Sequence, residues 1–263
     1  MKKIKVAVNG ACGRMGREVC NAILNEGKDL ELTGALDVNN LGEDIGSILG
    51  LSKLNIPVVE PTTDNLLQLK PDVIVDFTTP LVVMDNIKLA LQCNVRPIVG
   101  TTGITQVDLN RIRKWVEDRR LSALIAPNFA LGAVLMMKFA SIAAQYLPQA
   151  EIIELHHDQK IDAPSGTSLK TAEMIAANRL TDPPHKEDLQ KLAGVRGGIK
   201  NGIHIHSLRL NGLVAHQEVI FGGEGQTLTI RHDSYDRKSF MPGIIMAVKK
   251  IISLEGLFYG LET

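Results

Sequence analysis

Short runs of apolar residues alternate with stretches of helical spacing through the first half of the chain. We expect strands at 4–8, 30–36, 73–77, 97–99 and 123–126, and helices at 15–25, 82–92 and 106–119. Strands separated by helices of this length indicate βαβ units in a parallel sheet, because a parallel pair of strands needs a long crossover connection. The carboxyl ends of such strands meet at one edge of the sheet, where small ligands bind.

The pattern changes after Phe129. We expect helices at 131–146, 166–179 and 240–254, and strands at 151–157, 203–210, 214–221 and 227–232. Gly-containing turns separate the last three strands, which is typical of an antiparallel meander. The charged segment 181–191 contains Pro183-Pro184 and is predicted to be a loop or a short surface helix.

These patterns predict an α/β protein with two domains. The first is a Rossmann-like domain with a parallel sheet, and the second is a smaller α+β domain with a mixed or antiparallel sheet. We place the first domain at 1–127 and 236–263, because the last helix can pack back on it, and the second at 128–235.

Composition excludes several classes of function. The 263 residues carry 29 Lys and Arg and 29 Asp and Glu, so the net charge is zero, which argues against a broad electrostatic grip on nucleic acid or anionic lipid. The uncharged stretch 121–137 is interrupted by Pro127, so it is not expected to span a membrane. An odd set of three cysteines (Cys12, Cys20 and Cys93) argues against a disulfide framework or a Cys-rich zinc site and favours the cytoplasm.

The first predicted strand is followed by the turn Gly10-Ala11-Cys12-Gly13-Arg14-Met15-Gly16, which opens the first helix. Glycines allow a backbone to approach a pyrophosphate, and the N–H groups of the helix start hold the anion. The spacing is G-x-x-G-x-x-G, with Ala11 in the place of a glycine of the usual motif. Asp37 closes the second predicted strand, where a carboxylate can bind an adenosine ribose. We interpret the segment as a dinucleotide site; the alternative is a glycine-rich turn with an unrelated acid.

The choice between NADH and NADPH depends on nearby cations. Val38 follows Asp37, so no cation adjoins the acid, although Arg14 and Arg17 are close enough in sequence to reach a 2′-phosphate. We expect NADH, with NADPH tolerated. Loops at 78–79, 100–103 and 126–129 also follow strands and are expected to line the same edge, where the nicotinamide ring would lie; each can equally be an ordinary turn.

The second predicted domain carries the most specific segment, at 154–167. His156 and His157 end a strand, Lys160 follows, and Ser165-Gly166-Thr167 has the pattern of a helix N-cap. Histidine suits proton transfer near neutral pH, while the cation and the helix start can bind a carboxylate. The alternative is a strand-end histidine pair beside a capped helix. His204 and His206 share a strand face, but nothing in their spacing supports a zinc site, so no metal is expected.

Five segments together make the chain resemble the dihydrodipicolinate reductase family of lysine and diaminopimelate biosynthesis. They are G-A-C-G-R-M-G (10–16), V-D-F-T (75–78), V-G-T-T-G (99–103), A-P-N-F (126–129) and H-H-x-x-K-x-D-A-P-S-G-T (156–167). Members of the family often carry Arg where this chain has Val38, and Ala where it has Ser168. The first departure argues against a strong preference for NADPH.

The resemblance implies NADH- or NADPH-dependent reduction of 4-hydroxy-tetrahydrodipicolinate by a homotetramer, with closure between the domains. A ring-hydroxylated dicarboxylate would lose water, accept hydride at ring C4 and gain a proton at the adjacent carbon. The family pattern makes His156 the proton donor and acceptor, Lys160 a proton donor, and His157, Gly166 and Thr167 substrate ligands. The residues implied for the cofactor are Gly10, Ala11, Cys12, Gly13, Arg14, Met15, Asp37, Gly100, Thr101, Thr102, Ala126, Pro127, Asn128 and Phe129.

Other classes of protein remain open from the residues alone. One is another small reductase with a Rossmann-like domain, and another is a protein that binds NAD(H) without catalysis, as a sensor or an inactive relative. The charge balance offers no basic patch for a DNA-binding regulator. Turnover of freshly made hydroxy-tetrahydrodipicolinate separates these alternatives.

Overall fold

The computed structural model describes residues 2–182 and 189–261, and these form two compact units. Unit 1 comprises the chain up to Phe129 together with Phe240–Leu261, and unit 2 runs from Ala130 to Ser239. Part of the segment predicted as a loop or surface helix at 181–191 lies outside the described residues.

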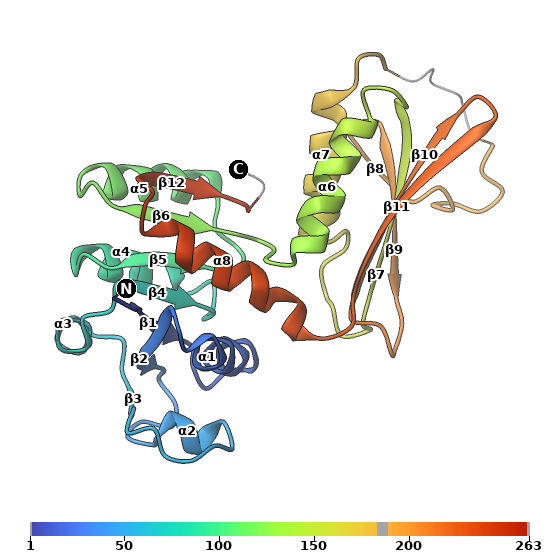
Figure 1. Cartoon of the computed structure of the whole chain (residues 1–263). Helices are drawn as coiled ribbons and strands as arrows, with labels where there is room; N and C mark the ends of the chain where they lie inside the picture. Colours follow the sequence, from blue (N-terminus) through green and yellow to red (C-terminus); the bar gives the residue numbers. More distant parts are fainter. Residues whose placement is uncertain (1, 183–188, 262–263) are drawn as a thin grey trace. The chain divides into compact units, whose positions relative to one another are not determined.

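Unit 1 is built on a seven-stranded sheet in which every pairing is parallel (Figure 1). In spatial order the strands are β12 (Gly256–Tyr259), β6 (Ser122–Ile125), β5 (Arg96–Val99), β4 (Val73–Asp76), β1 (Ile4–Asn9), β2 (Leu30–Leu36) and β3 (Val58–Val59). Asn9 is aligned with Leu36 on one side and with Asp76 on the other, so the carboxyl ends of the three central strands lie level. The predicted parallel sheet is confirmed.

Helices cover both faces of this sheet. The helices are α1 (Arg14–Glu26), α2 (Ile45–Ile48), α3 (Thr63–Leu69), α4 (Val83–Gln92), α5 (Gln106–Glu117) and α8 (Met241–Ile251). Val6 and Val8 point to the face that packs with α1 and α8, whereas Ala7 points to the opposite face, which α3 and α4 cover. This alternation along β1 is the period-two pattern of a strand whose two faces are both buried.

Several elements of unit 1 were not predicted from the sequence. The short elements α2, β3 and α3 fill the connection between β2 and β4, and β12 extends the sheet beyond the last helix. The expected helix at 240–254 is shorter: a 3₁₀ turn at Arg237–Phe240 precedes α8, and the chain leaves the helix after Ile251 to form β12. A strand of only four residues carries too little alternation to be recognised.

Unit 2 contains a five-stranded sheet with two helices packed on it (Figure 1). In spatial order the strands are β11 (Gln226–Ser234), β10 (Ala215–Gly223), β7 (Gln149–His156), β9 (Ile203–Arg209) and β8 (Gly198–Lys200), and the helices are α6 (Leu131–Ala143) and α7 (Gly166–Asn178). The expected mixed sheet is confirmed. Of the expected meander, the antiparallel pair β10–β11 is present, but β9 does not pair with β10. β7 lies between β9 and β10, parallel to the first and antiparallel to the second. Apolar alternation identifies strands but not their neighbours, and the central strand is an earlier segment of the chain.

Candidate active site

The turn between β1 and α1 is shaped by close backbone contacts. The backbone N–H groups of Gly10 and Ala11 both donate to the Leu36 carbonyl, at 2.9 and 3.1 Å. Gly10 has a φ of +77°, and a Cβ on it would lie 2.7 Å from the Phe77 carbonyl oxygen. A Cβ on Gly16 would lie 2.0 Å from the Gly10 oxygen, so the helix start rests directly on the turn. Glycine is required at both positions for this approach.

The start of α1 meets the requirements of a pyrophosphate site. Its N-cap is Gly13, and among the described residues no side chain caps its free N–H groups and no acid lies in its first turn. Free N–H groups and the positive end of the helix dipole favour an anion here. The residues present therefore fit the dinucleotide that the sequence predicted.

Asp37 lies at the end of β2, only 8% exposed. Its Oδ1 accepts from the N–H groups of Val38 and Asn39, at 2.8 and 3.0 Å, and its Oδ2 accepts from the Cys12 N–H at 2.9 Å. The Asp37 carboxylate thus links the glycine turn to the second strand. Its Oδ2 keeps acceptor capacity for a ribose hydroxyl.

Two other residues of the turn have structural tasks. The Arg17 Nε donates to the Cys12 carbonyl at 2.8 Å, so this guanidinium fixes the turn. Burial, together with the Asp37 charge, raises the pKa of the Cys12 thiol to about 11. Cys12 is therefore a protonated small residue rather than a reactive thiolate.

Asp76 organises the neighbouring loops, a role that sequence reasoning missed. It closes β4, is 2% exposed, and accepts five hydrogen bonds from four residues. Its Oδ2 accepts from the side-chain amides of Asn9 and Asn86, at 2.9 and 3.0 Å. Its Oδ1 accepts from the Thr78 N–H and hydroxyl, at 3.0 and 2.7 Å, and from the Thr101 hydroxyl at 3.0 Å. The strand-end position of the acid was the available signal, the same signal that pointed to Asp37.

The predicted loops of unit 1 converge at Phe77. A Cβ on Gly100 would lie 2.2 Å from Cε1 of Phe77, and the rings of Phe77 and Phe129 lie 5.9 Å apart. Backbone hydrogen bonds attach both loops to the sheet: the Gly100 N–H donates to the Asp76 carbonyl, and the Ala126 N–H donates to the Val99 carbonyl. The structure therefore brings the 100–102 and 126–129 segments to the edge that carries the glycine turn.

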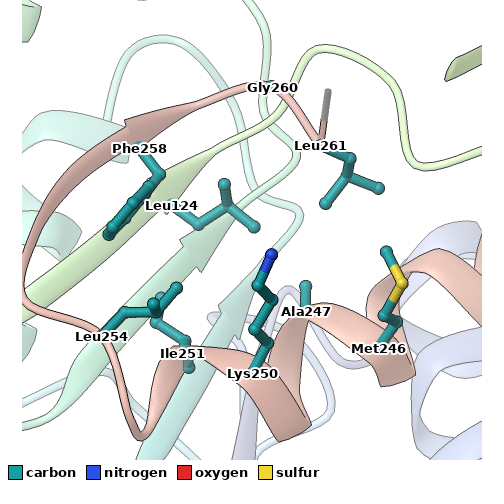
Figure 2. Close-up of a pocket in the computed structure, with 9 residues that line it drawn as sticks. All are labelled: Leu124, Met246, Ala247, Lys250, Ile251, Leu254, Phe258, Gly260 and Leu261. Carbon is teal, nitrogen blue, oxygen red and sulfur yellow. The ribbon is translucent and has the colours of Figure 1, made fainter. Parts of the chain in front are cut away.

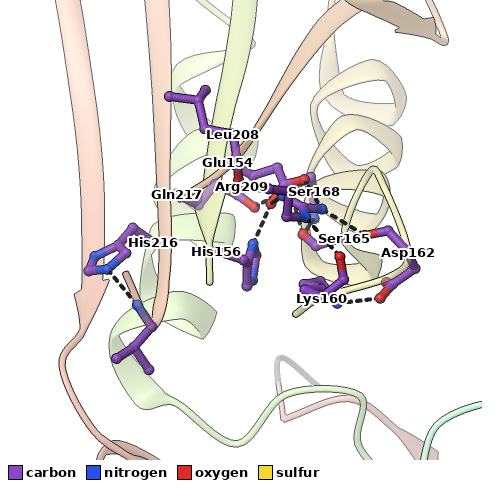
Figure 3. Close-up of polar contacts among 11 residues, drawn as sticks. Glu154, His156, Lys160, Asp162, Ser165, Ser168, Leu208, Arg209, His216 and Gln217 are labelled. Carbon is purple, nitrogen blue, oxygen red and sulfur yellow. Dashed lines mark hydrogen bonds and ion pairs between the residues drawn. The ribbon is translucent and has the colours of Figure 1, made fainter. Parts of the chain in front are cut away.

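In unit 2, the polar side chains of the 154–167 segment are gathered around a buried carboxylate, Glu154 (Figure 3). Glu154 is 0% exposed and accepts from Nδ1 of His156 and from both terminal nitrogens of Arg209. Burial alone would raise the pKa of Glu154, but the hydrogen bonds from His156 and Arg209 outweigh it and lower the pKa to about 2. His156 itself is 14% exposed. Sequence reasoning assigned no role to Glu154 or Arg209.

Lys160 lies in the loop that follows β7. Its Nζ donates to Oδ1 of Asp162 at 2.6 Å, and the carboxylate of Asp162 is 63% exposed. The ammonium lowers the pKa of Asp162. Arg209 also donates to the backbone carbonyls of Lys160 and Asp162, at 3.3 and 2.6 Å, so the loop and the Glu154 cluster share one guanidinium.

The predicted helix start is present at α7. Ser165 is the N-cap, and its hydroxyl accepts from the Ser168 N–H at 3.2 Å. The Ser168 hydroxyl donates to Oε1 of Gln217 at 2.8 Å, which gives this departure from the family pattern a buried partner. Gly166 and His157 are exposed. The structure joins Lys160 to the His156 cluster through Arg209, and the His157 carbonyl accepts from the Lys160 N–H at 3.2 Å.

Comparison with known proteins assigns the chain to a family. The model of the dihydrodipicolinate reductase N-terminus matches residues 4–129, and that of the dihydrodipicolinate reductase C-terminus matches residues 132–263. The chain belongs to the dihydrodipicolinate reductase family. The expected enzyme class, an oxidoreductase, is confirmed, and so is the use of NADH or NADPH at the level of the family.

Individual relatives match over nearly the whole chain. The 4-hydroxy-tetrahydrodipicolinate reductase of Syntrophomonas wolfei is 50% identical over 262 residues, covering 99% of this chain and 98% of the relative. That of Listeria welshimeri is 54% identical, covering 98% of each. A dipicolinate-bound dihydrodipicolinate reductase from Paenisporosarcina sp. TG-14 superposes with a TM-score of 0.86 at 46% identity, covering 99% of both chains.

The other features singled out in the sequence lie elsewhere. The rings of His204 and His206 share a face, 6.4 Å apart; Nδ1 of His204 bonds the Arg196 carbonyl at 2.6 Å, and Nε2 of His206 bonds Oε2 of Glu151 at 2.8 Å. Within residues 2–182 and 189–261, no three His, Cys, Asp or Glu side chains are placed to hold a metal ion. The same described ranges contain no helix with the length and apolar character needed to cross a membrane.

Unit 1 also has an apolar cavity of about 120 Å³ between α8 and the strands β6 and β12 (Figure 2). It is lined by Leu124, Met246, Ala247, Lys250, Ile251, Leu254, Phe258, Gly260 and Leu261. None of the residues predicted to bind cofactor or substrate lines it.

Proposed function

We propose that this chain is a 4-hydroxy-tetrahydrodipicolinate reductase of lysine and diaminopimelate biosynthesis, reducing its substrate with NADH or NADPH. The observation that carries the proposal is the full-length match, at about half identical residues, to reductases with that activity. The intact cluster around His156 and Lys160 supports catalysis over a role as a sensor.

Unit 1 would hold the cofactor. The pyrophosphate would lie on the free N–H groups that follow Gly13, and the adenosine ribose beside Asp37. Val38, which follows Asp37, carries no charge and is 71% exposed, and Nε of Arg17 donates to the turn rather than toward the end of β2. We therefore propose NADH as the preferred cofactor, with NADPH tolerated. The nicotinamide would adjoin 100–102 and 126–129.

Unit 2 would hold the substrate, which carries two carboxylates. Dipicolinate, the ligand of the Paenisporosarcina structure, is likewise a six-membered nitrogen ring with two carboxylates, which supports a dicarboxylate site in the family. Lys160 supplies a cation, and the backbone N–H groups of Gly166 and Thr167 would supply donors at the start of α7. His157, exposed at the end of β7, completes the proposed ligand set.

The chain's own residues would supply orientation and the proton. The cofactor, when bound, supplies hydride to ring C4. His156 would deliver a proton to the adjacent ring carbon, and Lys160, in the loop that follows β7, would hold or protonate the substrate. Because acid–base groups contribute roughly 10²–10⁴-fold, His156→Ala should lower kcat by that factor while KM for NADH stays unchanged.

The test is the loss of NADH absorbance when purified protein meets freshly made hydroxy-tetrahydrodipicolinate. Turnover supports the reductase. NADH binding without turnover would instead identify a sensor or an inactive relative, and turnover of another carbonyl or imine substrate alone would identify a different reductase.

We further propose that the enzyme is a cytoplasmic homotetramer, the assembly that the family pattern implies. The three free cysteines suit a reducing compartment. Light scattering coupled to size-exclusion chromatography tests the assembly, and a monomer of 28.7 kDa would refute it.

A further inference from the structure

We propose that Glu154 and Arg209 form a positioning pair for the proposed reductase: Glu154 fixes the His156 ring with its Nδ1 as the donor, and Arg209 ties this carboxylate to the Lys160 loop. The inference rests on the proposed function, because it concerns the residues that would transfer the proton. Neither residue was assigned a role by sequence reasoning.

Glu154 has no access to solvent and therefore acts only through its neighbours. It contacts Nδ1 of His156, two residues further along the same strand. A carboxylate accepts only, so the bonded ring nitrogen must carry its hydrogen, and Nε2 is left as the nitrogen that exchanges a proton. On proton delivery, Nε2–H breaks and a C–H bond forms on the substrate, while Nδ1–H stays with Glu154.

Arg209 makes this arrangement rigid. It stands opposite His156 in the parallel pairing of β7 with β9. Its two terminal nitrogens donate to the two oxygens of Glu154, at 2.8 and 3.0 Å, the bidentate geometry that fixes a carboxylate plane. The same guanidinium donates to the carbonyls of Lys160 and Asp162. The Arg209 side chain thus fixes the position of the His156 imidazole, through Glu154, and of the loop that carries the Lys160 ammonium.

The charges around His156 come from several elements. On the loop after β7 these are the Lys160 ammonium and the Asp162 carboxylate, and on β9 the charge is Arg209. On β10, His216 is engaged with Asp233 of β11 at 2.7 Å. Glu154 is the carboxylate in direct contact with the His156 ring, and its lowered pKa keeps it ionised over the working range.

The chain provides a matched control on the same strand. Glu151 also accepts from a histidine and an arginine, His206 and Arg196. It lies three positions before Glu154 on the strand, so it points to the opposite face of the sheet. Glu151→Gln therefore repeats the chemical change without touching the proposed site.

The experiment compares Glu154→Gln, Glu151→Gln and wild type in the NADH assay across pH. Glu154→Gln removes the charge and lets the ring take the other tautomer. We expect kcat to fall roughly 10–100-fold, the range typical of partners that orient a metal-bound imidazole. KM for NADH should stay unchanged, and the limb of the kcat profile that depends on imidazolium should move toward acid. Glu151→Gln should match wild type in all three respects.

Unchanged kcat and pH profile in a folded Glu154→Gln variant would overturn the inference, as would an equal effect of Glu151→Gln. An inactive wild type would instead refute the proposed function. If Glu154→Gln does not fold, the ¹⁵N chemical shifts of the His156 ring in the wild-type protein still decide: a protonated Nδ1 supports the pair, and a neutral ring with its hydrogen on Nε2 refutes it.

Discussion

Replacing Asp76 with Asn tests whether one buried carboxylate holds the cofactor edge of unit 1 together. Its five hydrogen bonds come from β1, from α4, from its own loop and from the loop after β5. Asn keeps one oxygen, which can still accept from Thr78 and Thr101. Its new NH₂ group faces the NH₂ groups of Asn9 and Asn86, donor against donor.

The magnitude follows from those two lost bonds. Hydrogen bonds to a charged group contribute about 1.5–3 kcal/mol each, and the Asn9 and Asn86 amides can recover part of the loss by turning. We therefore expect Asp76→Asn to lower the free energy of unfolding of unit 1 by about 3 kcal/mol. With a urea dependence of about 2 kcal/mol per M, the midpoint falls by about 1.5 M. The Kd for NADH should rise about tenfold, because Asn9, which directly precedes the glycine turn, is no longer held.

Trp115 allows the unfolding of unit 1 to be measured by fluorescence. It is the only tryptophan of the chain and lies on α5, so its fluorescence in urea reports unit 1. Asp118→Asn, at an exposed carboxylate that ends the same helix, is the control and should leave both values unchanged. If Asp76→Asn unfolds at the same urea concentration as wild type and binds NADH equally well, the assignment of Asp76 as an organising residue is wrong.

Three further changes have defined outcomes. Gly16→Ala places a methyl group 2.0 Å from the Gly10 oxygen, so the turn must move. The Kd for NADH, measured by fluorescence titration, should rise at least tenfold. The control Gly198→Ala places its methyl group in open space and should leave this Kd unchanged. Asp162→Asn removes the counter-ion of Lys160, so KM for the dicarboxylate should fall a few-fold at low salt, and a rise would show that Asp162 positions the ammonium instead. The pKa of Glu154 is lowered from 4.5 to about 2, so the ionised carboxylate stabilises the folded state by on the order of 3 kcal/mol. This stabilisation is complete above pH 4.5 and is lost as the pH falls toward 2. The loss of stability with acid, followed by circular dichroism, should therefore be shallower in Glu154→Gln.

The sequence predicted most of the framework of unit 1 because its strands and helices are long enough to show their periods. The run at 30–36 and its closing acid coincide with β2 and Asp37. The four-residue β12 and the two-residue β3 were missed because they carry too few residues for a pattern. In unit 2, each main strand was recognised, but their order was not, because side-chain alternation contains no information on which edges pair.

The residues of the candidate site also fall into those that the sequence predicted and those that it did not. Residues with recognisable chemistry, such as His156 and Lys160, were named from the sequence. Glu154 was passed over because a polar residue between Ile153 and Leu155 has the alternation of a strand with one solvated face. Arg209 lies 55 residues away on a strand whose pairing was unknown. Their relation exists only through the parallel register of β7 and β9.

Both organising carboxylates, Asp76 and Glu154, lie at or near strand ends and are almost completely buried. Removing a carboxylate from water costs several kcal/mol, which a fold recovers only if donors surround it. An apolar side chain would fill the same space without that cost, so stability alone does not account for either acid. What an apolar residue cannot do is fix the direction of several donors at once. At Asp76 those donors include Thr101, in a loop proposed to adjoin the nicotinamide, and at Glu154 they include the imidazole proposed to move the proton. The two acids therefore mark where the geometry of each unit must be held most rigidly.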